Sequence, residues 1–275
     1  MSGTRPPRQA GSFRWGRAIL SGHAWLVYLF LYAPIAILVI FSFNRGSQTA
    51  VWQGLTLDWY RSLARNDLIL AAVRNSLIVG VASTAVATVF GTLAALALGR
   101  YEFRGKGFTR NLLFLPIIIP EIVVGAALVT FFGAAQLRLS LATVVLAHIV
   151  FSVSYVAIVV RARLSGFDES LEEAARDLGA RPLATFRRVT LPLILPGVIA
   201  GALLVFTISI DDYVITSFVA GVGSTTLPLQ IYSMLKVGVT PEVNAVSTLL
   251  LLVTVVLIVI AQRLQQAPAE GGKEP

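Results

Sequence analysis

In Glu173-Ala174-Ala175-Arg176-Asp177-Leu178-Gly179, followed by Val189-Thr190-Leu191-Pro192, the chain carries a polar, helix-forming insert between long uncharged stretches. A membrane protein rarely keeps a loop of this kind unless something docks there. The insert therefore predicts both a boundary between two spans and a surface for a partner.

The composition around the insert places the chain in a lipid bilayer. Of its 275 residues, 56% are hydrophobic and only 13% are charged, and the mean hydropathy is +0.79. A soluble domain carries about 25% charged residues. We therefore predict a membrane protein rather than a globular one.

Six stretches are long and apolar enough to cross a bilayer as helices, which requires about 20 residues each. They are residues 24–43, 76–99, 111–133, 139–160, 189–210 and 243–262. A seventh uncharged stretch, 214–235, is interrupted by glycine, serine, threonine and proline, so we interpret it as an external or re-entrant loop. The fold class predicted is an all-α membrane protein with six transmembrane helices.

The basic residues orient these six spans. If the N-terminus is cytoplasmic, most of the 22 Lys and Arg residues lie in the inner segments, as the positive-inside rule expects. Both termini are therefore predicted to be cytoplasmic. The predicted organisation is a tail at 1–23, a transmembrane domain at 24–262 with a cytoplasmic loop at 161–190, and a second tail at 263–275; the two ends of the chain, 1–17 and 267–275, are predicted to be disordered.

Several functions are excluded by what the sequence lacks. The net charge of +8 flanks the spans instead of forming one aromatic-interleaved stripe, so we expect no nucleic-acid partner. The chain has no cysteine, no H-E-x-x-H and no G-x-S-x-G motif, and Gly99–Gly107 departs from the phosphate-loop spacing. We expect no catalytic residue, no metal site and no nucleotide site in this chain.

The insert itself has the local signals of a short helix. Ser170 and Glu173 match the capping-box spacing, and Gly179 suits a left-handed stop. Between them, apolar residues follow at helical spacing: Leu171, Ala174, Ala175 and Leu178. Pro182 then restarts a helix. The apolar face either contacts a partner or packs under the chain's own bundle, and the residue pattern leaves both alternatives open.

These motifs resemble the EAA loop of ABC-importer permeases, with valine at 189 where isoleucine is usual. The resemblance covers nearly the whole chain and is to the second permease of spermidine/putrescine-type importers. It rests on Leu57-Asp58-Trp59-Tyr60, Asn75-Ser76, Pro116 to Glu121, Asp211-Asp212, Gly223-Ser224-Thr225-Thr226-Leu227-Pro228 and Ile231-Tyr232-Ser233-Met234.

The resemblance implies a type I ABC-importer permease in a bacterial inner membrane. Its insert would be a coupling helix seated in a cytoplasmic ABC ATPase dimer through Leu171, Glu173, Ala174, Ala175 and Gly179. It further implies a second permease subunit and an extracytoplasmic solute-binding protein, with ATP bound by the separate ATPase subunit and no cofactor in this chain.

Three acids at or near membrane depth are the candidates for a cation pathway: Glu121, Asp211 and Asp212. A carboxylate at a helix centre costs about 2.5–3.5 kcal/mol on insertion scales, so it usually serves a cation path or a pair. Tyr213 would be a cation–π neighbour. Pro116 and Pro120 are predicted to break the third span, so Glu121 alternatively complements a half-helix N-terminus. The two aspartates alternatively lie at the water interface.

Two other readings remain open. An importer of the same architecture could carry another small organic cation or an amino-acid derivative, and an ATP-independent secondary transporter would also use intramembrane acids and broken helices. His148, inside an apolar span, is interpreted as a hydrogen-bonded structural residue.

Overall fold

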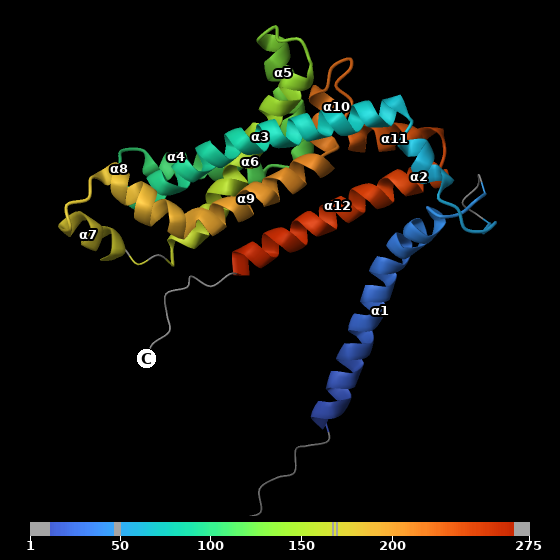
Figure 1. Ribbon diagram of the computed structural model, residues 1–275, viewed down its shortest axis with the longest axis horizontal. Coiled ribbons are helices and arrows are strands. Elements are labelled where there is room, and N and C mark those ends of the chain that lie inside the picture. The colour runs from blue at the N-terminus through green and yellow to red at the C-terminus, as the bar shows by residue number, and fades with distance from the viewer. Residues whose placement is uncertain (1–11, 47–50, 167, 169, 267–275) are drawn as a thin grey trace, which may run out of the picture.

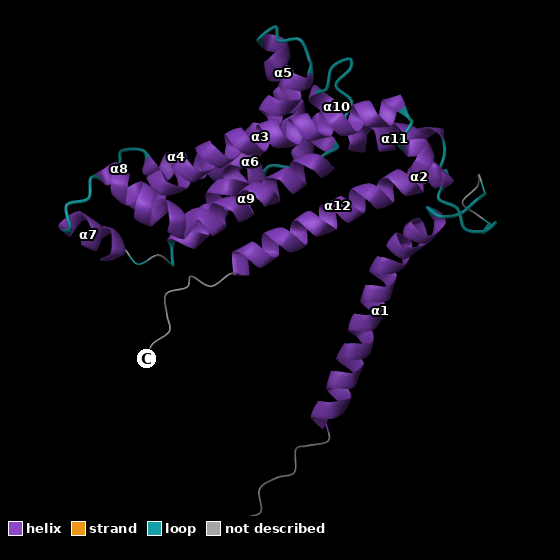
Figure 2. Cartoon of the chain, viewed as in Figure 1, coloured by secondary structure: helices purple, strands orange, loops and turns teal. Residues whose placement is uncertain are grey.

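The computed structural model describes residues 12–46, 51–166, 168 and 170–266, and this part of the chain is helical almost throughout (Figures 1 and 2). In chain order the elements are α1 (Ser12–Phe41), α2 (Asp58–Leu63), α3 (Asp67–Arg100), α4 (Lys106–Ile118), α5 (Glu121–Ala134), α6 (Leu141–Leu164), α7 (Ser170–Asp177), α8 (Pro182–Thr185), the π-helical turn η1 (Phe186–Thr190), α9 (Leu191–Asp211), α10 (Val214–Val219), α11 (Leu227–Val237) and α12 (Pro241–Gln266).

Long apolar helices dominate this architecture. In the described residues, five helices are long and apolar enough to span a membrane, and the total is six if the pair α4 and α5 forms one broken span. These two helices are bent by 109° at their junction. The all-α membrane fold is therefore confirmed, and so is the predicted break in the third span. Pro116 and Pro120 account for the break, because proline removes a backbone donor and restricts the residue before it.

The core of the molecule lies where α3, α6 and α9 pack side by side, with α12 against α9 (Figure 1). Glycine permits the close crossing of α3 and α6, since a Cβ at Gly91 would lie 2.6 Å from the Cβ of Val156. Around this crossing, Val156, Val160 and Val205 are fully buried. The contact fixes the long helices that carry the functional side chains.

The first helix stands apart from this core. Its apolar stretch Ile19–Phe41 has no buried residue, and Figure 1 shows α1 diverging from the bundle, with α12 as its neighbour. An apolar helix of this length without a buried residue suits contact with lipid or with another membrane subunit.

Several predicted boundaries are shifted. The helix α1 begins at Ser12, so part of the predicted tail 1–23 is helical, because apolar residues such as Ile19 and Leu20 continue the span toward the N-terminus. The disorder predicted for 1–17 is therefore wrong from Ser12 onward, whereas residues 1–11 and the tail 267–275 lie outside the described residues. Helix α3 likewise starts early, at Asp67, where the Asn66 side chain accepts the amides of Leu68 and Ile69.

The stretch 214–235, predicted as an external or re-entrant loop, contains two short helices, α10 and most of α11, and is not among the candidate membrane spans of the described residues. Residues of α10 such as Ile215 and Val219 are buried, and α10 packs against α5 and α6. The glycines and serine at 221–224 form only the turn between the two helices. Apolar burial on both sides of this turn outweighs the turn-forming composition.

Candidate functional site

The insert folds as the separate short helix α7, and Gly179 ends it. The backbone at Gly179 has φ +82°, a left-handed conformation that glycine adopts without strain. The amide of Gly179 donates to the Arg176 carbonyl at 2.8 Å, and the amide of Ala180 donates to the Ala175 carbonyl at 3.0 Å. These bonds satisfy the last carbonyls of the helix, so the predicted helix and its stop are both present.

The start of α7 differs from the capping-box prediction. Ser170 is the first helical residue rather than the cap, and its amide donates to the Asp168 carboxylate at 3.0 Å. Hydrogen bonds from the Ser170 side chain and backbone hold the pKa of Asp168 below its usual value. Asp168 rather than Ser170 therefore caps the start of α7, because an aspartate accepts the helix amides and its charge also complements the positive end of the helix.

The apolar face of α7 is open. Leu171 is 47% exposed and Leu178 is 89% exposed, and Glu173, Ala174 and Gly179 are exposed as well. Among the residues predicted to contact a partner, Ala175 is half-buried. The alternative in which this face packs under the chain's own bundle does not hold.

A residue that the sequence reasoning missed attaches α7 to the bundle. The Glu172 carboxylate pairs with the Arg100 guanidinium at 3.2 Å and with that of Arg176 at 3.5 Å, and it accepts the Thr190 hydroxyl at 2.7 Å. The only sequence signal was the four-residue spacing from Glu172 to Arg176, which is typical of an intrahelical pair.

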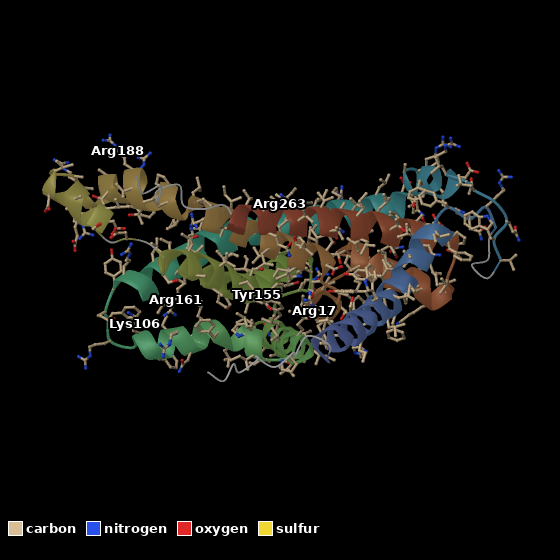
Figure 3. All side chains as sticks on the ribbon, turned by 90° about the horizontal axis from the view of Figure 1, so that it is seen from below. Arg17, Lys106, Tyr155, Arg161, Arg188 and Arg263 are labelled. Atoms are coloured by element: carbon tan, nitrogen blue, oxygen red, sulfur yellow. The ribbon has the colours of Figure 1, made fainter. Side chains whose placement is uncertain are left out.

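The same end of the molecule gathers basic residues. Figure 3 shows Lys106, Arg161 and Arg188 at the end that carries α7. These residues come from α4, α6 and η1. Arg161 and Arg188 belong to the loop 161–190 that is predicted to be cytoplasmic, so α7 and these basic residues lie at the same end of the molecule.

A buried polar network joins four helices in the apolar part of the bundle. His148 is fully buried, its Nδ1 lies 2.6 Å from the Ser209 hydroxyl, and its Nε2 lies 3.0 Å from the Thr216 hydroxyl. The Ser209 hydroxyl also lies 3.3 Å from that of Ser83. The structural interpretation of His148 fits these contacts, because each ring nitrogen has a hydrogen-bond partner.

Asp212 belongs to this network. Its carboxylate accepts the Thr216 amide at 2.8 Å and the Thr216 hydroxyl at 2.7 Å, and it lies 3.3 Å from Nε2 of His148. Its side chain is only 5% exposed. The carboxylate thus meets the N-terminal end of α10 from inside the protein, where the helix amides stabilise negative charge.

Asp211 and Tyr213 lie elsewhere, in a cavity of about 430 Å³ between α1, α11 and α12. Asp211 is exposed and has no hydrogen-bond or ion-pair partner among the described residues. The Tyr213 ring lies 4.4 Å, centroid to centroid, from that of Tyr232, and apolar residues such as Ile231 and Leu250 complete the wall. A carboxylate, two aromatic rings and apolar walls match the needs of an alkyl ammonium ion.

Glu121 is separate from both groups. It is the first residue of α5, it follows Pro120, and it is exposed. It does not line the cavity of Asp211. This position fits the helix-terminus alternative, and a place for Glu121 in a cation path stays a prediction.

No three His, Asp or Glu side chains lie close enough together within the described ranges to hold a metal ion. The groups that the fold brings together are thus the Glu172 cluster, the His148–Asp212 network and the Asp211 cavity. Their chemistry is hydrogen bonding, ion pairing and cation contact.

Comparison with protein families gives one match. Residues 87–268 match the family described as "Binding-protein-dependent transport system inner membrane component". This range includes α7, the Asp211 cavity residues of α11 and α12, and the His148–Asp212 network except for Ser83.

Curated relatives are similar over most of their length. The chain is 42% identical over 256 residues to the "Spermidine/putrescine transport system permease protein PotC" of Escherichia coli K12, covering 93% of this chain and 97% of that protein. It is also 42% identical over 233 residues to the "Putrescine transport system permease protein PotI" of the same organism, covering 82% and 83%.

Solved structures share the fold at low identity. A bacterial alginate ABC transporter in complex with an alginate-bound periplasmic protein matches with a TM-score of 0.72 and 17% identity, covering 94% of this chain and 96% of that chain. An amino acid ABC transporter matches with a TM-score of 0.59 and 15% identity, covering 78% of this chain and 100% of that chain. These two matches concern the fold alone.

Proposed function

The chain belongs to the family of binding-protein-dependent transport system inner membrane components, and from this premise we propose that it is a multi-pass permease subunit that imports polyamines. Relatives at 42% identity carry spermidine/putrescine and putrescine permease names. We propose that the chain itself has no catalytic residue, because the energy comes from ATP bound by a separate subunit.

The observation that carries the substrate proposal is the Asp211 cavity. A polyamine presents primary ammonium groups on a flexible methylene chain, so it needs anionic or aromatic contacts for its ends and apolar contacts for its middle. The contacts for the ammonium ends come from Asp211, Tyr213 and Tyr232. The apolar contacts for the methylene chain come from the walls formed by α1, α11 and α12.

One contact within the chain supports the aromatic part of this proposal. Nζ of Lys236 lies 4.9 Å from the centroid of the Tyr232 ring. A primary ammonium group on an alkyl stem thus already lies on the face of this ring. A substrate ammonium group would have the same chemistry, so Tyr232 joins Asp211 and Tyr213 as a proposed pathway residue.

Asp212 has a different proposed role. Its carboxylate is occupied by Thr216 and His148, so we propose that it positions α10 beside the cavity rather than meeting the cation directly. Glu121 remains a proposed pathway residue on the strength of its exposed carboxylate at the α4–α5 break.

The proposed partners follow from the exposed face of α7 and from the family of the chain. The exposed face of α7, with Leu171, Glu173, Ala174, Ala175 and Gly179, would dock on a cytoplasmic ABC ATPase dimer. A second permease subunit would complete the translocation path, and an extracytoplasmic solute-binding protein would deliver the substrate. Closure of the ATPase dimer would then move the membrane helices through α7.

The test is uptake of labelled putrescine and spermidine into vesicles that hold the chain with its ATPase, permease mate and binding protein. We expect ATP-dependent uptake by the wild type and at least a tenfold loss in Asp211→Asn, which corresponds to about 1.4 kcal/mol of lost cation contact. The matched control is Asp67→Asn, an exposed aspartate at the start of α3, which should keep wild-type uptake.

Two outcomes would count against the proposal. ATP hydrolysis stimulated by the binding protein without polyamine uptake would keep the importer and discard the substrate. Equal uptake by Asp211→Asn and Asp67→Asn would remove the Asp211 cavity from the pathway.

A further inference from the structure

Helix α7 is attached to the rest of the chain in an unusual way. All residues of α7 are described, and among them Glu172 is the only buried one. Its neighbours Leu171 and Glu173 are exposed. An amphipathic helix usually holds its place by burying an apolar stripe, whereas α7 keeps that stripe open and buries a carboxylate.

The backbone of α7 gives it little other support. Its close backbone neighbours are chiefly α8 and η1, the segments that follow it in the chain. The link to α3 is made by side chains, through the pair between Arg100 and Glu172 at 3.2 Å. Both partners are largely buried, with 15% and 11% of their side chains exposed.

The residues that meet Glu172 lie at structural junctions. Arg100 is the last residue of α3, and Thr190 is the last residue of the π-helical turn η1, where the chain enters α9. In η1 the amide of Leu191 donates to the Phe186 carbonyl, one residue further back than in an α-helix. One carboxylate therefore connects the ends of two long membrane helices to α7.

We propose that Glu172 is a positioning residue that holds α7, α3 and the start of α9 together as one rigid unit. A displacement of α7 then moves α3 and α9 with it. Without the carboxylate, α7 would still form, because Asp168 and Gly179 cap its ends, but it would pivot about its connection to α8. This inference rests on the proposed function, since it assumes that α7 receives the movement of an ATPase.

A purely stabilising role predicts something different. If the pair only stabilises the fold, then removing both charges together should restore normal behaviour, because no unpaired charge remains buried. If the pair transmits movement, the neutral double variant should be as stable as the wild type yet remain poorly coupled. The double variant Arg100→Gln/Glu172→Gln therefore separates the two roles.

The experiment measures geometry and coupling on the same complexes. The chain contains no cysteine, so spin labels can be placed at Asp177→Cys on α7 and Val89→Cys on α3, both exposed. A reference label pair, Val89→Cys and Val150→Cys, reports α3 against α6. Distances between the two spin labels are recorded in the full complex by double electron–electron resonance. Polyamine uptake per ATP hydrolysed is measured on the same complexes.

We expect Glu172→Gln and the double variant to broaden the α7–α3 distance distribution while leaving the α3–α6 reference unchanged. Uptake per ATP should fall about tenfold, within the range of typical coupling free energies. The matched control is Glu102→Gln, which removes the exposed partner of Lys106 at the same end of the molecule and should change neither readout.

An unchanged α7–α3 distribution, or unchanged uptake per ATP in the double variant, would overturn the positioning role. A wild-type complex that takes up no polyamine would contradict the proposed function instead. In that case the distance distributions alone decide the role of Glu172, because they require no substrate.

Discussion

Two carboxylate side chains, those of Glu172 and Asp212, are largely buried in the described part of the chain, and they are neutralised in different ways. Glu172 meets two guanidinium groups and one hydroxyl, whereas Asp212 meets the amide and hydroxyl of Thr216 and an imidazole. The first lies among permanent positive charges at the end with α7. The second lies in the apolar bundle, where helix dipoles and hydrogen bonds replace full charges.

The side chains that contact these two carboxylates also differ in their exposure to solvent. If Glu172 is removed, Arg176, with 60% of its side chain exposed, can turn toward water, whereas Arg100, with 15% exposed, stays largely buried. If Asp212 is removed, His148 and Thr216 are left inside the protein with no exposure at all. The difference indicates that Asp212 contributes more to stability than Glu172 does.

The largest expected effect tests this contrast directly. Asp212→Ala should lower the free energy of unfolding by about 3 kcal/mol, because buried donors lose their acceptor. Glu172→Ala should cost less, about 2 kcal/mol, because only one of its two guanidinium partners, Arg100, stays largely buried. Both are measured by unfolding of the purified protein in mild detergent with increasing sodium dodecyl sulfate.

Asp212→Asn is the control for this comparison, since an amide oxygen can still accept from Thr216. It should retain more than half of the lost stability. Equal costs for Asp212→Ala and Glu172→Ala would show that the exposure of the partners does not decide the effect.

A smaller effect on stability, but a clear one on coupling, is expected at the stop of α7. Proline fixes φ near −65°, whereas Gly179 has φ +82°, so Gly179→Pro should disrupt the end of the helix and abolish ATP-coupled uptake. Insertion should be unchanged, because Gly179 is exposed and a Cβ built there would meet no atom within 4 Å. Uptake and membrane insertion are measured on the same vesicles.

Gly179→Ala separates the backbone from the side chain. A Cβ at this position would meet no atom within 4 Å, so the only cost is the left-handed conformation, about 1–2 kcal/mol. This variant should keep most of the uptake. Normal uptake by Gly179→Pro would remove the helix stop from the coupling surface.

Sequence patterns were sufficient for features set by local rules. Apolar length identified the spans, and the glycine at 179 identified the end of α7, because both depend on neighbouring residues only. The break between α4 and α5 was also visible as Pro116 and Pro120. Its angle of 109° was not, since the direction of a broken helix is set by what it packs against.

Features that depend on contacts between distant segments could not be predicted in the same way. Asp211 and Asp212 are adjacent in sequence and were treated as a pair, yet only Asp211 lines the cavity. The chain leaves α9 at this point, so consecutive side chains face different neighbours. Similarly, Arg100 and Glu172 are 72 positions apart, and no local rule connects them.

The smallest expected effect concerns the cap of α7 and the pH at which it is lost. Hydrogen bonds from Ser170 lower the pKa of Asp168 in the folded protein, so the ionised carboxylate stabilises the helix start at neutral pH. That contribution is complete above the unfolded pKa, near 3.8, and disappears as the pH falls through the lower folded value. The first amides of α7 should therefore lose protection from hydrogen exchange only in this acidic range. The measured exchange rates are corrected for the intrinsic effect of pH on exchange. Asp168→Asn keeps an acceptor but has no titrating group, so its exchange should not respond to acid, and an identical acid response in this variant would assign the effect to another residue.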